Sequence, residues 1–312
     1  AARLAAAGHD ISVVVRGENL QAMVRDGLQM REGAEAVKVK VRASQNPAEL
    51  GPQDLVISTL KATGLRALAT GVQPLLGPRT PIVFAQNGIP WWYASGSAQG
   101  SGQPDLGFLD PGGVLRASVG IERVIGGVIH SSNRVVAPGV VENESPGSNR
   151  LIVGEVDDRP SERIAELRAL LEAAGLKSPE PASIRTAIWN KLVFNLSGSP
   201  LCVLTGAPAT VITEYADAGK VAWSNLHEAA AIARACGVEI AMEPLETSMR
   251  NPPNHKSSLL QDYELHRPME VDAILMGPLE LARAAGVPVP GLQTVAWLVS
   301  TLAQQRKLYT PH

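Results

Sequence analysis

A lysine and an asparagine stand one helical turn apart in an otherwise apolar segment. Residues 189–195 read Trp-Asn-Lys-Leu-Val-Phe-Asn, so Lys191 and Asn195 are four residues apart and share a face if the segment is helical. A helix that is apolar nearly all round is a buried one, and a buried lysine needs a partner unless its chain extends to solvent. The pattern therefore predicts either an ammonium group that does acid–base chemistry or a lysine that reaches the surface.

Further polar residues follow three segments that have the composition of buried strands. Because ligands of parallel α/β sheets gather at the carboxyl ends of the strands, these positions are candidates for nucleotide or substrate binding. An arginine after an early strand suits the 2′-phosphate of NADP, although a surface arginine or ordinary turn chemistry explains the same residues. The candidates are Arg16 at the end of residues 11–16, Ser58, Thr59, Leu60 and Lys61 at and just after the end of residues 54–59, and Asn87 and Gly88 after residues 81–85.

A third polar group lies in the last part of the chain. Ser258 and Asp262 are one helical turn apart, and Glu270 stands two residues after Pro268. Ser258 and Asp262 have the spacing of a helix cap and a solvated face, and Glu270 suits the first turn of a helix, where the helix dipole favours a carboxylate. On spacing alone, the structural interpretation of this group is the stronger one.

The order of predicted elements places these residues in an α/β domain followed by a helical domain. Strands over 11–16, 37–41, 54–59 and 81–85 alternate with helical segments, which predicts a doubly wound parallel sheet of the Rossmann type. Strands and turns follow over 119–155, and a helix with acidic residues near its start follows residue 160. The proline-containing break at 177–181 divides residues 1–180 from an all-helical domain over 181–312.

Residues 90–113 interrupt the alternation with a Gly-, Ser- and Pro-rich stretch that carries three consecutive aromatic residues. Trp91, Trp92 and Tyr93 begin only a few residues after Asn87. A long loop in a compact domain is often a lid or a binding loop, but it also packs its own aromatic side chains against the domain. Both interpretations stay open at this point.

Composition excludes several classes of function. The 312 residues are 45% hydrophobic and 19% charged, with a formal net charge of −2, which is ordinary for a globular protein and gives no basic block for nucleic acid. Its apolar runs are too interrupted to cross a bilayer. The six histidines lack paired metal-ligand spacing, so we expect no structural metal. Cys202 and Cys236 are widely separated in apolar surroundings, which indicates reduced thiols and a cytoplasmic protein.

Taken together and in order, the motifs resemble those of the ketopantoate reductase family, also called 2-dehydropantoate 2-reductases. No single motif identifies the family, but the set of motifs, in this order and at this spacing, extends over almost the whole chain. The motifs are Arg16, Ser-Thr-Leu-Lys at 58–61, Gln-Asn-Gly at 86–88, Trp-x-Lys-x-x-x-Asn at 189–195, Ser-Ser-Leu-Leu-Gln-Asp at 257–262, and Glu270-Val-Asp with Gly277.

The resemblance implies an NADPH-dependent reduction of 2-dehydropantoate to (R)-pantoate, on the route to pantothenate and coenzyme A. It implies a Rossmann domain and a helical domain like that of 6-phosphogluconate dehydrogenase. By the same resemblance, Lys191 is the general acid and Glu270 is its carboxylate partner. The residues that match substrate ligands of the family are Asn87, Asn195, Ser199 and Ser258. Those that match its cofactor contacts are Arg16, Ser58, Thr59, Leu60, Lys61, Asn87, Gly88 and Glu270.

Two features set this chain apart from that pattern. Ser199 stands where many relatives have an asparagine, so the substrate is held differently there. The glycine-rich turn of dinucleotide-binding folds is not in the sequence, and we expect it, with a strand, to precede residue 1.

Three rival functions follow from the same residues. One is a paralogous reductase of another 2-oxoacid, motivated by Ser199 and the aromatic loop. A second is a non-catalytic NADP-binding sensor, and a third is an NAD-dependent opine-type dehydrogenase, which Arg16 disfavours. A small-molecule substrate is the expected partner, and a homodimer is left open.

Overall fold

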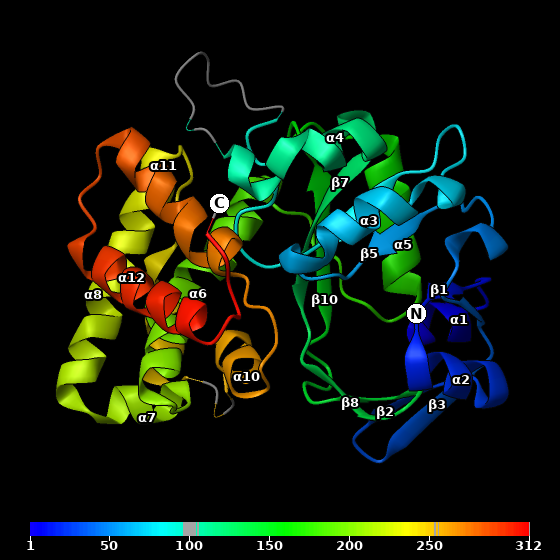
Figure 1. Ribbon diagram of the computed structural model, residues 1–312, viewed down its shortest axis with the longest axis horizontal. Helices are drawn as coiled ribbons and strands as arrows, with labels where there is room; N and C mark the ends of the chain where they lie inside the picture. The colour runs from blue at the N-terminus through cyan, green and yellow to red at the C-terminus, as the bar shows by residue number, and fades with distance from the viewer. Residues whose placement is uncertain (96–103, 105, 253, 255, 312) are drawn as a thin grey trace. The chain divides into compact units, whose positions relative to one another are not determined.

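The computed structural model describes residues 1–95, 104, 106–252, 254 and 256–311 (Figure 1). The chain folds as two compact units. The first comprises Ala1–Thr59, Ala67–Ala85 and Leu115–Ile184, and the second comprises Leu60–Arg66, Gln86–Val114 and Arg185–His312.

This division differs from the expected boundary at residue 180, because residues 181–184 belong to the first unit and two earlier segments belong to the second. Residues 60–66 and 86–114 were expected in the first domain, whereas both belong to the second unit. Backbone hydrogen bonds explain the difference, because the Ala62 N–H donates to Glu270 and the Ile89 N–H donates to the Ala273 carbonyl, at 2.9 and 2.7 Å.

The first unit is built on parallel strands, as the sequence predicts. A hydrophobic core packs around a four-stranded sheet in the order β10-β7-β6-β5, in which β10 alone runs antiparallel to its neighbour. Helix α5 covers β10 with Ile164, Leu167 and Leu171, and the Ser161 hydroxyl caps its first turn by accepting from the Ile164 N–H. The fold class predicted from the sequence is confirmed.

Other strands and helices of the first unit lie before, between and after the strands of this sheet along the chain. Strands β1 and β4 form a separate parallel pair. The strands are β1 (Ser12–Val14), β4 (Arg42–Ser44), β5 (Val56–Ser58), β6 (Ile82–Ala85), β7 (Val124–His130) and β10 (Arg150–Glu155). The helices are α1 (Ala2–Ala6), α2 (Gly17–Asp26), α3 (Leu65–Gly71), α4 (Val114–Val119) and α5 (Glu162–Ala173). The first residues of α3 and α4 are counted with the second unit. Short 3-10 turns of the first unit lie at Pro47–Glu49, Gln73–Leu75 and Ile121–Arg123, and those at Ala62–Gly64, Gly107–Leu109 and Pro111–Gly113 belong to the second unit.

A second four-stranded sheet, which the sequence did not predict over residues 28–32, completes the first unit. It consists of β2 (Leu28–Glu32), β3 (Glu35–Val39), β8 (Asn133–Ala137) and β9 (Val140–Asn143), in the order β3-β2-β9-β8. Residues 28–32 read Leu-Gln-Met-Arg-Glu, which alternate over only four positions and include no β-branched or aromatic residue, so the strand signal is weak.

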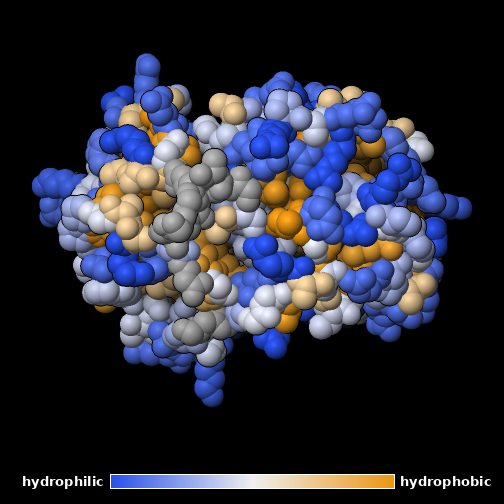
Figure 2. All heavy atoms as spheres, turned by 90° about the horizontal axis from the view of Figure 1, so that it is seen from above, coloured by the Kyte–Doolittle hydropathy of each residue, from blue (hydrophilic) through white to orange (hydrophobic). Residues whose placement is uncertain are grey.

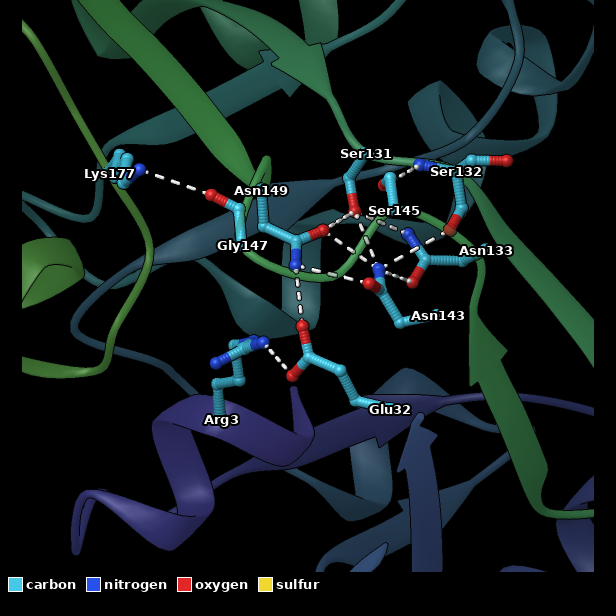
Figure 3. Close-up of polar contacts among 10 residues, drawn as sticks. All are labelled: Arg3, Glu32, Ser131, Ser132, Asn133, Asn143, Ser145, Gly147, Asn149 and Lys177. Carbon is cyan, nitrogen blue, oxygen red and sulfur yellow. Dashed lines mark hydrogen bonds and ion pairs between the residues drawn. The ribbon is translucent and has the colours of Figure 1, made fainter. Parts of the chain in front are cut away.

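A buried polar network ties this second sheet to α1 and to the start of β10 (Figure 3). Asn149 donates to Glu32 at 3.2 Å and accepts from Asn143 at 2.7 Å, and Glu32 also pairs with Arg3. Ser131 donates to the same Asn149 oxygen. Because its buried members bond to one another, the network rigidifies the unit.

The second unit is all helical among the described residues. Its helices are α6 (Ile184–Thr205), α7 (Ala209–Glu214), α8 (Ala216–Ala235), α9 (Met242–Arg250), α10 (Ser258–Glu264), a π-helix labelled η7 (Asp272–Met276), α11 (Gly277–Ala285) and α12 (Pro290–Gln305). Figure 1 shows α11 and α12 alongside α8, in agreement with their contacts. The Glu228 carboxylate on α8 accepts from the Gly291 and Leu292 N–H groups and so caps α12.

The surface is ordinary for a chain of this composition. The face in Figure 2 is mostly hydrophilic, interrupted by groups of apolar residues. Within the described part of the chain, no helix is long and apolar enough to span a membrane.

Candidate active site

Lys191 lies on a helix that is buried on most of its circumference. Around it on α6, Trp189, Leu192 and Val193 are almost fully buried, whereas Asn190 is exposed. Lys191 itself is only partly accessible as a residue. The buried helix predicted from the apolar pattern is therefore confirmed.

The charge that faces Lys191 is the carboxylate of Glu270. Burial lowers the pKa of the Lys191 ammonium from 10.5 to about 8, and the negative charge of Glu270 partly opposes that shift. An amine with a pKa near neutrality is suited to give up a proton, and Glu270 keeps it charged at neutral pH. The charge of Glu270 therefore acts on Lys191, and the roles of acid and carboxylate partner that the family resemblance implied stay a prediction.

Glu270 is buried, with only 2% of its surface exposed, and is held by several donors. Its Oε1 accepts from the Ala62 N–H at 2.9 Å, and the Asn87 side chain also donates to it. Burial raises the pKa of the Glu270 carboxyl, while the Ala62 and Asn87 hydrogen bonds and the Lys61 charge lower it. The structure therefore brings Lys61, Asn87, Lys191 and Glu270 together within the second unit.

Lys61 forms an ion pair that the sequence did not reveal. Its Nζ lies 2.5 Å from both carboxylate oxygens of Asp262, whose side chain is nearly inaccessible. The interpretation of Asp262 as part of a solvated helix face is therefore wrong. The sequence did carry a signal, since Asp262 lies in a run with the apolar Leu259 and Leu260, which are both buried.

Gly88 allows the segment with Asn87 to lie directly against the π-helix that follows Glu270. Gly88 has a φ of +78°, and a Cβ there would be 2.3 Å from the Ala273 carbonyl oxygen. A π-helix shifts carbonyls out of the usual α-helical pattern, and the Ala273 carbonyl accepts from the Ile89 N–H. Within this unit, Gly88 therefore serves close backbone packing, and its predicted cofactor contact stays a prediction.

The predicted substrate ligands lie on two helices of the same unit. Asn195 is one turn beyond Lys191 on α6, and Ser199 is a further turn along; both are half-buried. Ser258 is the exposed first residue of α10, whereas the neighbouring Ser257 caps that helix by accepting from the Leu260 N–H. The capping role weighed for Ser258 thus belongs to Ser257, and the Ser258 hydroxyl is exposed.

The three consecutive aromatic residues of the 90–113 loop are core residues. Trp91, Trp92 and Tyr93 are each at most 7% exposed. Trp189 Nε1 donates to the Tyr93 hydroxyl at 2.7 Å, and the Arg185 guanidinium donates to the Tyr93 carbonyl at 2.9 Å. The part of the loop at 96–103 and 105 lies outside the described residues. These contacts connect the loop to α6, two residues before Lys191.

The predicted cofactor contacts in the first unit have the chemistry for a nucleotide. Arg16 is exposed and stands at the N-cap of α2, directly after the β1 region. Ser58 ends β5, and its buried hydroxyl has no hydrogen-bond partner among the described residues. A buried polar atom without a partner needs an explanation, and a bound ligand is one. Thr59 follows it and is exposed; Leu60, 46% exposed, begins the next segment.

A parallel α/β unit together with a helical unit that holds a buried lysine–glutamate pair defines a class, the nucleotide-dependent oxidoreductases. Comparison with known proteins gives the family. Residues 1–94 match the family described as "Ketopantoate reductase PanE/ApbA", and residues 183–303 match its C-terminal counterpart. A curated 2-dehydropantoate 2-reductase of Mesorhizobium japonicum is 37% identical over 313 residues, which cover 99% of this chain and 95% of the relative. The chain belongs to the ketopantoate reductase family, as its motifs predicted.

Solved structures agree with this assignment. A protein of Ralstonia solanacearum MolK2, provisionally assigned to the ketopantoate reductases, is 36% identical with a TM-score of 0.88 over 99% of this chain and 94% of its own. The 2-dehydropantoate 2-reductase of Geobacter metallireducens is 27% identical with a TM-score of 0.83 over 97% of this chain and 94% of its own. D-mandelate dehydrogenase in complex with NADH and anilino(oxo)acetate has a TM-score of 0.81 at 20% identity over 98% of this chain and 94% of its own, which shows a shared fold.

Replacing Gly88 by alanine tests the backbone packing beside Glu270. The new methyl group meets the Ala273 carbonyl in a left-handed conformation, so we expect a loss of roughly 2–4 kcal/mol of stability and at least a tenfold lower kcat. Gly286 is the matched control, since its φ is +66° and a methyl group there would have no other atom within 4 Å, which predicts a loss of only about 1 kcal/mol. Equal urea-unfolding midpoints for Gly88→Ala and Gly286→Ala would contradict this account.

Proposed function

We propose that this chain catalyses the NADPH-dependent reduction of 2-dehydropantoate to (R)-pantoate. The observation that carries the proposal is the buried Lys191–Glu270 pair, which Asn87 and the Ala62 N–H hold in the second unit. Its support also comes from the 37% identical relative of that name, which the chain matches over nearly its full length.

Lys191 acts as the general acid of the reaction. NADPH, when bound, supplies the hydride for the ketone carbon of the substrate. Negative charge then develops on the ketone oxygen, and the Lys191 ammonium stabilises it and donates a proton to it. Because burial lowers the pKa of Lys191 to about 8, that donation is easier than from an ordinary lysine.

The residues around the pair orient the substrate and keep the acid charged. Glu270 favours the protonated form of Lys191 and is itself fixed by Asn87. Asn195 hydrogen-bonds the substrate from the same face of α6, and the exposed Ser258 hydroxyl binds its carboxylate. Ser199, one turn further along α6, contacts the part of the substrate that differs among 2-oxoacids.

Arg16 accounts for the choice of NADPH over NADH. An arginine just after an early strand of a dinucleotide fold pairs with the 2′-phosphate, whereas an acidic residue there binds the ribose hydroxyl of NAD. Arg16 is exposed at the start of α2, so its guanidinium is accessible to such a phosphate. Ser58, Thr59 and Leu60 provide further cofactor contacts, and Lys61 and Gly88 act near Asn87.

A reductase of a different 2-oxoacid is the second candidate. Ser199 favours it, because a serine reaches less far than the asparagine found in many relatives. The D-mandelate dehydrogenase fold also accommodates another oxoacid, anilino(oxo)acetate, in that protein. A panel of 2-oxoacids distinguishes the candidates, since a higher kcat/KM on another acid than on 2-dehydropantoate favours the second.

The cellular setting is part of the proposal. The free thiols of Cys202 and Cys236 support a reducing, cytoplasmic location. A homodimer is a further hypothesis, which sedimentation analysis of the purified protein tests.

Removing the Lys191 amine tests the proposed acid. We expect Lys191→Ala to lower kcat by about 10² to 10⁴, the range of general acid catalysis, in assays with NADPH and 2-dehydropantoate. Lys220→Ala is the control, because Lys220 is a surface residue of α8 and its loss leaves kcat unchanged. Full kcat in Lys191→Ala would sink the mechanism.

The rate of reduction should depend on pH through Lys191. The folded-state pKa of about 8 lies below the ordinary 10.5, so Lys191 is charged below pH 8 and loses its proton as the pH rises through 8. Because kcat/KM reports the pKa values of the free enzyme, we expect kcat/KM for reduction to be constant near pH 6.5–7 and to fall with a midpoint of about 8. A profile flat to pH 10 would argue against Lys191 as the acid.

Arg16→Ala tests the cofactor preference. Loss of a charge-assisted hydrogen bond to the 2′-phosphate should raise the KM for NADPH about tenfold or more and leave the KM for NADH unchanged. Arg31→Ala, an exposed arginine in β2, serves as the control. Similar changes with both cofactors in Arg16→Ala would show that the 2′-phosphate is bound elsewhere.

A further inference from the structure

We propose that residues Arg306–Tyr309, called here the C-terminal tail, position Glu270 for catalysis and that Tyr309 is the anchoring residue. Only the expected effect of the tail on turnover rests on the proposed function. The contacts that support it all lie within the second unit.

The tail turns back sharply at the end of α12. The Lys307 N–H donates to the Gln304 carbonyl at 2.9 Å, and the Leu308 N–H donates to the Ala303 carbonyl at 2.8 Å. Lys307 has a φ of +58°, an uncommon conformation for a residue with a side chain. The turn buries Leu308 to 6% exposure, so apolar burial offsets the cost of this backbone geometry.

Two hydrogen bonds join the tail to the residues on either side of Glu270. On one side, the Met269 N–H donates to the Leu308 carbonyl at 2.9 Å. On the other, the Tyr309 hydroxyl donates to Oδ1 of Asp272. The catalytic carboxylate is therefore bracketed by contacts one residue before it and two residues after it.

These contacts act at a place where the backbone departs from regular α-helix. Asp272 begins the π-helix, and the Glu270 carbonyl accepts from the Ile274 N–H at 3.0 Å. The Glu270 carbonyl itself makes a four-residue α-helical bond, whereas the five-residue spacing of the π-helix begins at Asp272, so the irregular backbone is the part that directly follows Glu270. The bond from Tyr309 supplies a charge-assisted contact at the first residue of that segment.

The position of Glu270 matters because several charges meet around it. Lys191 faces it from α6, Lys61 from the segment before α3, Asp262 from α10, and Asp272 belongs to its own segment. If Glu270 moves away from Lys191, the contribution that raises the pKa of Lys191 weakens while burial still lowers it. Loosening the tail should thus lower the pKa of Lys191 further, so that a smaller fraction of the amine is charged at neutral pH and able to donate a proton.

The test compares Tyr309→Phe with Tyr215→Phe in the full chain. Tyr215 is 66% exposed before α8 and serves as the matched loss of one hydroxyl. The pKa of Lys191 is measured from the pH dependence of its acetylation by acetic anhydride, followed by mass spectrometry of its peptide. We expect Tyr309→Phe to lower that pKa by roughly half a unit or more and Tyr215→Phe to leave it unchanged.

Turnover provides the second readout. With 2-dehydropantoate and NADPH, we expect Tyr309→Phe to lower kcat about three- to tenfold with the KM for NADPH unchanged. Asp272→Asn, which weakens the same bond from the other side, should give a similar loss, and the double variant should be less than additive. Asp272→Asn also replaces Tyr309→Phe if that variant does not fold.

An unchanged or raised Lys191 pKa in Tyr309→Phe would overturn the inference, because a raised value means general hydration of the site. A lowered pKa with unchanged kcat would likewise overturn it, since the tail would then not position a group that limits turnover. If the wild-type protein turns over no 2-oxoacid, the proposed function fails, and the acetylation pKa still decides whether the tail holds Glu270 against Lys191.

Discussion

The burial of two opposite charges, Lys191 and Glu270, is the constraint on which the rest of the second unit depends. An isolated ion is costly to remove from water, so each charge needs a partner and further hydrogen bonds. Glu270 obtains them from the Ala62 N–H and the Asn87 amide, and Lys191 obtains its counter-charge from Glu270. The surrounding apolar helix gives Lys191 a pKa at which it can both hold and release a proton.

Satisfying these charges requires contributions from distant parts of the sequence. Ala62 follows one strand region of the α/β unit, Asn87 follows another, and Glu270 precedes the π-helix. Gly88 and the π-helix let two backbones approach closely enough for Asn87 to reach Glu270. The Lys61–Asp262 pair places a second pair of opposite charges nearby, and its charges also affect the pKa of Glu270.

Sequence alone predicted the features that are local or periodic. The apolar run around Lys191 predicted a buried helix, and the apolar runs over 54–59 and 81–85 predicted strands of a parallel sheet. Both could be predicted because a buried element is itself composed of apolar residues. Asp262 and the strand at Leu28–Glu32 were missed, since their environment is set by partners elsewhere in the chain. The buried position of Trp91 was undecided for the same reason, as its neighbours in sequence are loop-like.

The two early segments of the second unit bear on how this protein acquires its structure. The chain leaves the α/β unit at residue 60, returns at 67, leaves again at 86 and returns at 115 before entering the helices for good at 185. A fragment beginning at 185 would lack the donors to Glu270 and the Tyr93 hydroxyl that accepts a hydrogen bond from Trp189. Folding of the helical unit is therefore coupled to contacts of long sequence separation, which slow folding and make the two units interdependent in assembly.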